Sequence, residues 1–199
     1  MTMTTTLSGI YATPRGEAIT IRAMRPTDEK ALLDFLRRIP ADDRLYLRKD
    51  VTSAQLVAQW AENLNYSRVL PLLAIVDDKV VADATLHRDS APDRRHIGEL
   101  RIVIDPAYRN QGLGRFLLRR LVEIAKSEDP ELEKILFEIV ADAEQAAEHA
   151  ARAAGFVDAH EFSEYITYYN GKPHDLALMV LQLRAVPPEP THEPAEYMY

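Results

Sequence analysis

The sequence contains no cysteine. This absence excludes disulfide bonds, thiolate metal ligands and a cysteine nucleophile, so any catalysis must use other groups. No serine lies in the setting of a nucleophile elbow, which leaves a covalent hydrolase mechanism without support. We also expect no metal site, because His87, His96, His160 and His174 show no metal-ligand spacing.

Positive charge and long apolar runs are also scarce. Lysine and arginine number 24 against 31 aspartate and glutamate residues, which gives a formal net charge of −7. Such an acidic chain is a poor general ligand for nucleic acids or anionic membranes. No segment approaches the roughly 18 apolar residues that span a bilayer, and the N-terminus lacks the pattern of a secretory signal. We therefore expect a cytoplasmic protein with no nucleic-acid or membrane partner.

The two ends of the chain differ in composition from its middle. Residues 1–17 are rich in threonine and include Pro14 and Gly16, and residues 185–199 contain four prolines. Both segments are predicted to be flexible tails. The length of 199 residues and the 47% hydrophobic composition suit one core. Residues 18–184 are accordingly predicted to form a single domain.

Hydrophobic periodicity between these tails predicts a mixed α/β (α+β) fold. Helical spacing follows Pro26, Ser53, Gly112 and Asp142. Asp77-Asp78 and Asn170-Gly171 predict tight hairpin turns, the second of type I′. This order of elements is typical of a partly antiparallel sheet with helices on its faces. Strands are predicted at residues 19–24, 70–76, 79–87, 96–105, 134–140, 156–168 and 173–183.

The most informative segment is residues 102–115, where a predicted strand runs through a glycine-containing turn into a helix. Such a turn leaves backbone N–H groups exposed at the positive end of a helix dipole, which is an anion site. Arg109 and Arg115 add positive charge there. A Walker A loop is excluded because Arg115 and not lysine follows Gly114, and a dinucleotide fingerprint is excluded because Leu117 stands where a third glycine is needed. In the alternative interpretation, the glycines only cap a helix that packs closely on the sheet.

The run Arg109-Asn110-Gln111-Gly112-Leu113-Gly114 resembles the Arg/Gln-x-x-Gly-x-Gly/Ala loop of the GNAT acetyltransferase superfamily. The preceding Val-Ile-Asp-Pro and the later Ala-Ala-Gly-Phe are also similar to that family. The resemblance extends over roughly residues 19–183, although its sharp motifs occupy only about a dozen positions. It implies a GNAT fold, with a mixed, mostly antiparallel sheet of about seven strands and about four helices. It also implies that acetyl-CoA binds with its pyrophosphate on residues 109–115, Arg115 included, and its pantetheine arm along Ile102, Val103 and Ile104.

Within the resemblance, Glu99 is the candidate general base. Amide formation from a lysine-like amine needs the neutral nucleophile, and deprotonating such an amine at pH 7 costs roughly 4–5 kcal/mol. Glu99 is placed similarly to the catalytic glutamate of the protein-lysine acetyltransferases. The chain resembles the bacterial branch of those enzymes. The alternative is a structural glutamate paired with Arg101 or with one of Arg94 and Arg95.

The sequence departs from the family at the position of the general acid. The family's tyrosine, which protonates the leaving thiolate, corresponds to Ala151, and its asparagine corresponds to Glu144. A general acid adds only about 10²–10⁴-fold, so its loss predicts slower or rearranged chemistry more than none. The candidate substitutes are His149, Tyr165 and Tyr168. In the alternative interpretation, His149 lies on an exposed helix face and the two tyrosines are packing groups of a half-buried strand.

The resemblance implies transfer of an acetyl group to a primary amine by direct attack in a ternary complex. The acceptor is expected to be a protein lysine or N-terminus, or a small amine, chosen by residues 37–50 and by the closing hairpin at residues 165–174. Three alternatives stay open: use of a different acyl-CoA, a non-catalytic CoA-binding regulatory module, and an interaction protein without a cofactor. Either a monomer or a homodimer is compatible with the sequence.

Overall fold

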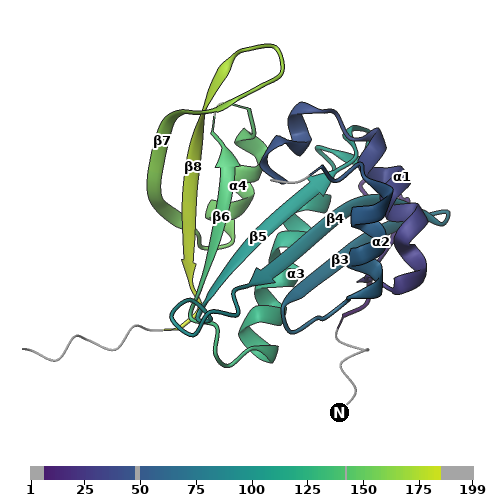
Figure 1. Cartoon of the computed structure of the whole chain (residues 1–199), viewed down its shortest axis with the longest axis horizontal. Helices are drawn as coiled ribbons and strands as arrows, with labels where there is room; N and C mark the ends of the chain where they lie inside the picture. The colour runs from purple at the N-terminus through teal and green to yellow at the C-terminus, as the bar shows by residue number, and fades with distance from the viewer. Residues whose placement is uncertain (1–6, 48–49, 142, 185–199) are drawn as a thin grey trace, which may run out of the picture.

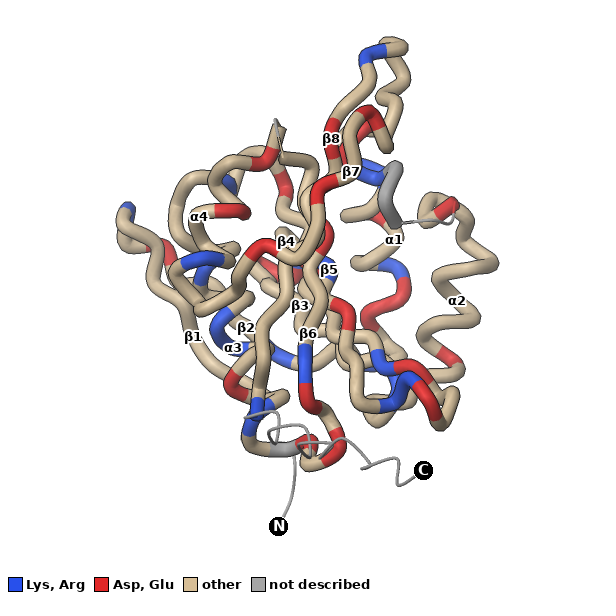
Figure 2. The backbone as a smooth tube through the Cα atoms, turned by 90° about the vertical axis from the view of Figure 1, so that its left-hand side faces the viewer, with Lys and Arg blue, Asp and Glu red and all other residues tan. Residues whose placement is uncertain are grey.

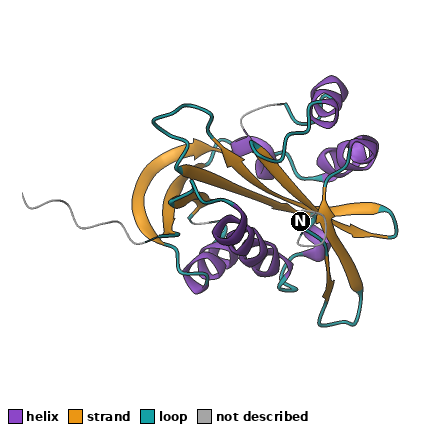
Figure 3. Cartoon of the chain, turned by 90° about the horizontal axis from the view of Figure 1, so that it is seen from below, coloured by secondary structure: helices purple, strands orange, loops and turns teal. Residues whose placement is uncertain are grey.

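The computed structural model of the chain describes residues 7–47, 50–141 and 143–184. An eight-stranded sheet runs through these residues, with helices on both of its sides (Figures 1 and 3). Short 3-10 turns η1 (Pro26–Asp28), η2 (Asp42–Leu47) and η3 (Pro106–Tyr108) join some of these elements. The helices are α1 (Glu29–Arg38), α2 (Ala54–Glu62), α3 (Leu113–Glu128) and α4 (Gln145–Ala153). The strands are β1 (Gly9–Ala12), β2 (Ala18–Ala23), β3 (Val69–Val76), β4 (Lys79–Arg88), β5 (Ile97–Ile104), β6 (Lys134–Val140), β7 (Val157–Thr167) and β8 (Pro173–Gln182).

The sheet has the order β1-β2-β3-β4-β5-β6-β8-β7, and every neighbouring pair is antiparallel except β5 and β6. A parallel pair needs a crossover connection, which α3 provides. The pairing covers residues 97–100 of β5 and 134–137 of β6. Beyond that point the two strands diverge, as the fan of arrows in Figure 1 shows. The middle of the sheet therefore opens toward the C-terminal ends of both strands.

The two faces of the sheet have separate apolar cores because side chains alternate along β4 and β5. On one face, Ala84 and Leu100 pack in the same cluster as Leu117 and Leu121 of α3. On the other face, Val103 packs in a cluster with Phe35 of α1 and the α2 residues. Helices α1 and α2 therefore cover one face, and α3 and α4 cover the other. Figure 3 shows helices on both sides of the sheet. Within the described residues, no helix is long and apolar enough to cross a membrane.

The predicted mixed, mostly antiparallel α/β fold is confirmed, with one more strand than expected. The additional strand is β1, which pairs with β2 across a turn at residues 13–16. The prediction of a tail through residue 17 was therefore wrong for residues 9–12, a run of only four residues that lies next to the threonine-rich start of the chain. Residues 185–199 and Asp142 lie outside the described residues, and the single-domain boundaries stay a prediction.

The two predicted hairpin turns had different outcomes. Asp77 and Asp78 both have positive φ, of 45° and 60°, which a tight turn of the primed type requires. In the closing hairpin only Gly171 is left-handed, with φ of 79°, so the predicted type I′ turn was wrong there. Tyr168 N–H donates to the Lys172 carbonyl at 3.0 Å, and Gly171 N–H donates to the Tyr168 carbonyl at 2.8 Å. This longer loop with a left-handed glycine extends the β7–β8 hairpin beyond the sheet (Figure 1).

Candidate functional site

A cleft of about 770 Å³ opens where β5 and β6 diverge. One wall is β5 from Glu99 to Ile104, and the opposite wall is β6 with α4. Tyr168 and His149 also contribute to the lining. The cleft reaches the turn before α3, where it is lined by Arg109, Asn110, Gly112, Gly114 and Arg115. The structure thus brings the predicted strand and most of the predicted loop to one cavity.

Backbone conformation directs the chain from β5 into α3. Asp105 accepts a hydrogen bond from Ala107 N–H at 3.1 Å, which starts the short turn η3. Asn110 and Gly112 then take left-handed conformations, with φ of 57° and 86°. Gly112 is the N-cap of α3, so the N–H groups of the first helical turn have no partner within the helix. These amides and the helix dipole make the end of the cleft attractive to an anion.

Two predicted loop residues do not line the cleft. Leu113 is 1% exposed and packs in the core beneath α3. The Gln111 side chain turns back and donates to the Ala107 carbonyl at 3.0 Å. Their contribution to the loop is therefore through the backbone and through packing.

Tyr11, which the sequence reasoning placed in a tail, contacts the loop directly. Its hydroxyl donates to the Gln111 carbonyl at 2.5 Å, and its ring lies 5.0 Å from that of Phe116. A Cβ added at Gly112 would lie 2.6 Å from the Tyr11 hydroxyl oxygen. The β1–β2 hairpin therefore holds the turn in place, at a point where only glycine leaves room. The Tyr11 hydrogen bond joins residues 100 apart in sequence, and local sequence patterns cannot reveal such a contact.

Arg109 connects the loop to the segment between α1 and α2. Its Nε donates to the Ile104 carbonyl at 3.0 Å, and one terminal nitrogen donates to Asp43 at 2.5 Å. The neighbouring Asp42 accepts from Tyr169 N–H at 2.8 Å. Turn η2 thus joins the predicted anion loop to the closing hairpin. Because Arg109 is already paired, Arg115, which is exposed and lines the cleft, is the cation more available to a ligand.

Glu99 lines the cleft and has the partner that the structural interpretation predicted. Its carboxylate accepts from Arg101 at 3.4 Å, a long contact, and the Glu99 side chain is 37% exposed. Arg94 instead contacts Asp89, at 3.6 Å. Since a weak exposed pair contributes little stability, the contact leaves Glu99 able to interact with a ligand.

The three candidates for the general acid separate clearly. Tyr168 and His149 line the cleft, and the Tyr168 ring stacks 3.9 Å from that of His174. Tyr165 does not line the cleft: it is 63% exposed on β7 and contacts the Phe162 ring at 5.0 Å. Ala151 is fully buried in α4.

A half-buried carboxylate that sequence reasoning missed lies on β4. Asp83 is opposite Val103 of β5 on the face covered by α1 and α2. Burial raises the pKa of Asp83 to about 6, and the hydrogen bond that it accepts from Thr85 at 3.0 Å acts in the opposite direction. No group of side chains suitable for a metal ion is found among the residues that the structure describes.

The chain is similar to known acetyltransferases in sequence and in structure. The sequence profile of the acetyltransferase (GNAT) family matches residues 33–156. An acetyltransferase of the GNAT family from Streptococcus pneumoniae is 26% identical with a TM-score of 0.70, and the match covers 82% of this chain and 99% of that chain. No curated protein sequence matches the chain.

More distant solved structures share the fold. YncA from Salmonella typhimurium, solved with its cofactor acetyl-CoA, is 21% identical with a TM-score of 0.68, over 83% of this chain and 94% of that chain. A ribosomal-protein-alanine N-acetyltransferase from Brucella melitensis is 24% identical with a TM-score of 0.66, over 81% of this chain and 98% of that chain.

Proposed function

The chain belongs to the acetyltransferase (GNAT) family, and from this premise we propose that it transfers an acetyl group from acetyl-CoA to a primary amine. The observation that carries the proposal is the cleft that begins where β5 and β6 diverge and ends at the N-terminus of α3. Its end at α3 offers first-turn amides, and its long wall is a strand with one side facing the cleft. A diphosphate with a long amide-containing arm fits that combination.

The residues at the end of the cleft next to α3 suit a diphosphate. The first-turn amides of α3 donate hydrogen bonds, and Arg115 supplies positive charge at the rim. At Gly114 an added Cβ would already meet Ile104 at 3.0 Å, so the helix approaches the strand closely there. The backbone of Ile102, Val103 and Ile104 would hold the amide-bearing arm on the side away from β4. When bound, acetyl-CoA supplies the acetyl group as a reactive thioester.

Proton transfer is assigned to side chains that line the cleft. Glu99 accepts the proton that the amine loses as the new amide bond forms. Tyr168 and His149 are the two groups placed to protonate the thiolate that departs. With no cysteine in the chain, we propose that the amine attacks directly, without an acyl-enzyme.

A panel assay of acetyl-CoA with primary amines tests the proposal. We expect thiol release that depends on the amine, with initial-rate lines that intersect as a ternary complex requires. Saturation at 100 times the dissociation constant should also stabilise the fold by about 2.7 kcal/mol. Absence of both binding and thiol release would refute the proposal.

One observation favours a second candidate, a non-catalytic CoA-binding module. Ala151 cannot donate a proton, and it is buried where the family has its tyrosine. The same assay separates the two functions. Tight binding of acetyl-CoA with no thiol release for any amine would support the module, whereas amine-dependent release assigns catalysis to the remaining groups.

A further inference from the structure

A second pocket, of about 250 Å³, adjoins the cleft and shares Glu99 and Arg101 with it. Four arginines line it, Arg68, Arg88, Arg94 and Arg101, against two carboxylates, Asp89 and Glu99. Since Arg88 is ion-paired with Asp129, outside this lining, the other three arginines and the two carboxylates leave a balance of +1, in a chain whose formal net charge is −7. Over the described backbone as a whole, acidic and basic residues are interspersed (Figure 2). A local excess of arginine in a pocket is therefore a feature that general composition does not explain.

The topology of the sheet brings these arginines together. Arg68 precedes β3, Arg88 ends β4 and Arg94 lies in the connection to β5. Arg88 N–H donates to the Arg68 carbonyl at 2.8 Å, which fixes the two backbones side by side. Arg101 lies on β5, opposite Thr85. The pocket is thus built on strand ends, next to the cleft.

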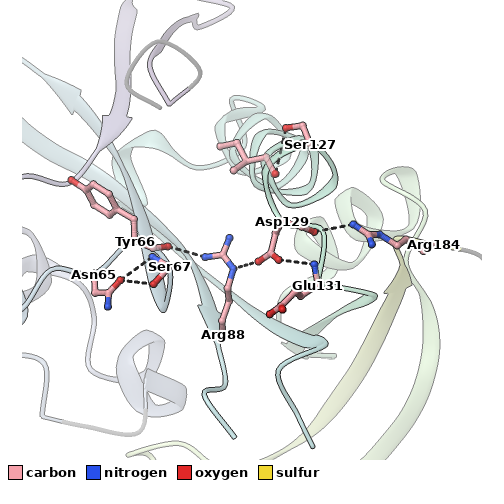
Figure 4. Close-up of polar contacts among 9 residues, drawn as sticks. Asn65, Tyr66, Ser67, Arg88, Ser127, Asp129, Glu131 and Arg184 are labelled. Atoms are coloured by element: carbon pink, nitrogen blue, oxygen red, sulfur yellow. Dashed lines mark hydrogen bonds and ion pairs between the residues drawn. The ribbon is translucent and has the colours of Figure 1, made fainter. Parts of the chain in front are cut away.

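Arg88 is held by other residues of the protein and forms one wall of the second pocket. Its guanidinium donates to the Tyr66 carbonyl at 2.9 Å and pairs with Asp129, which follows α3 (Figure 4). Asp129 also accepts from Glu131 N–H at 3.2 Å, and its carbonyl accepts from Arg184 at 3.1 Å (Figure 4). This network rigidifies the end of β4 and leaves Arg88 little freedom to move toward a ligand.

The remaining arginines are held weakly. The contact of Arg101 with Glu99 is 3.4 Å, and that of Arg94 with Asp89 is 3.6 Å, with the Arg94 side chain 55% exposed. Arg68 is exposed. Contacts of this length on partly or fully exposed side chains contribute little stability, whereas a guanidinium with a carboxylate or phosphate forms short, paired hydrogen bonds. An anion that enters the pocket would therefore draw these guanidiniums away from their present partners.

We propose that this arginine pocket binds an anionic group, a carboxylate or phosphate, carried by a small amine acceptor. The inference rests on the proposed transferase function. An acceptor whose anion contacts Arg68 and Arg94 has its amine near Glu99, because Glu99 borders both cavities. When Arg101 turns to the anion, Glu99 loses a hydrogen-bond donor and gains the freedom to accept the proton of the amine. Acceptor binding and preparation of the base are then one event.

Pairs of amines that differ only in the anionic group test the proposal. Lysine and cadaverine differ by one carboxylate, and phosphoethanolamine and ethanolamine differ by one phosphate. Binding is measured by titration calorimetry without acetyl-CoA, and kcat/KM is measured with it. We expect the anionic member of at least one pair to bind ten times more tightly or better, and the pair that responds identifies the anion.

The double variant Arg68→Gln/Arg94→Gln should abolish that preference and leave unchanged the weak binding of the amine that lacks the anionic group. Lys79→Gln is the matched control, since it removes one exposed positive charge from the other end of β4, about 30 Å away along the strand. Thermal unfolding verifies that the variants are folded. The proposal is overturned if neither anionic amine is preferred by the original chain, or if the double variant keeps the preference. Preference without any thiol release would instead refute the transferase function and leave the anion site standing.

Discussion

Gly112→Ala tests how the predicted anion-binding turn at residues 109–115 is held in place. Alanine at a φ of 86° costs about 1–2 kcal/mol in backbone strain. Its Cβ would also lie 2.6 Å from the Tyr11 hydroxyl oxygen, so the tyrosine must move. That movement breaks the 2.5 Å hydrogen bond to the Gln111 carbonyl, which adds about 1 kcal/mol. The free energy of unfolding should therefore fall by about 2–3 kcal/mol.

Tyr11→Phe separates the two contributions. It removes the hydroxyl, and the next atom, Cζ, lies at an ordinary 3.8 Å from the added Cβ. The single variant should lose about 1 kcal/mol, and Gly112→Ala in the phenylalanine background should then cost only the backbone strain. The double variant is expected to be about 1 kcal/mol more stable than the sum of the single changes predicts.

Urea unfolding of the four proteins gives this coupling free energy, and titration with acetyl-CoA shows whether affinity follows the same cycle. Gly171→Ala is the matched control, because Gly171 also has positive φ, of 79°, but no atom within 4 Å of an added Cβ. It should show the backbone strain alone. Strict additivity of the Tyr11 and Gly112 changes would refute the interpretation that β1 holds the loop through this contact.

Three further predictions concern the charged and proton-transfer groups. Glu99→Gln should lower the rate by about 10²–10⁴-fold near neutral pH and by less at high pH, where the amine is already deprotonated; a loss independent of pH in rate profiles would return Glu99 to a structural role. Because the pKa of Asp83 rises from 3.8 to about 6 on folding, the folded state binds more protons between these values, so its stability falls as pH rises through that window, by at most about 3 kcal/mol. Asp83→Asn should remove this contribution from urea-unfolding curves measured at pH 4 and pH 7, and an unchanged pH dependence would contradict it. Tyr168→Phe should lower kcat, whereas Tyr165→Phe, outside the cleft, should not; equal effects would argue against Tyr168 as the acid.

The sequence was sufficient wherever a local pattern determines the structure. The strand, turn and helix around Gly112 could be predicted because apolar spacing and glycine placement act over a few residues. Contacts between distant segments could not. Asp43 and Arg109 are 66 residues apart, and nothing in either segment indicates the other. The arginine pocket has the same origin, since its members are assembled by the pairing of β3, β4 and β5.

The turn at Asn170-Gly171 and the environment of Asp83 could not be predicted for a different reason. Asn170-Gly171 favours a type I′ turn locally, yet only Gly171 adopts positive φ, because a longer loop with its own hydrogen bonds replaced that turn. Asp83 occupies a position that alternation alone marks simply as facing α1 and α2. The pKa of Asp83 is raised because neighbouring elements shield its carboxylate from water, and that shielding is a property of the assembled fold.

Because β5 and β6 diverge, the centre of the sheet contains backbone groups that are not paired between these two strands. Most proteins expose free strand edges at the rim of a sheet, where solvent or another chain satisfies them. Here an internal strand offers its backbone on the side of β6 after only four paired residues. A ligand that lies along that edge would take the place of a missing strand. It would then be part of the architecture as well as a reactant, and occupancy and rigidity of the central sheet would rise together.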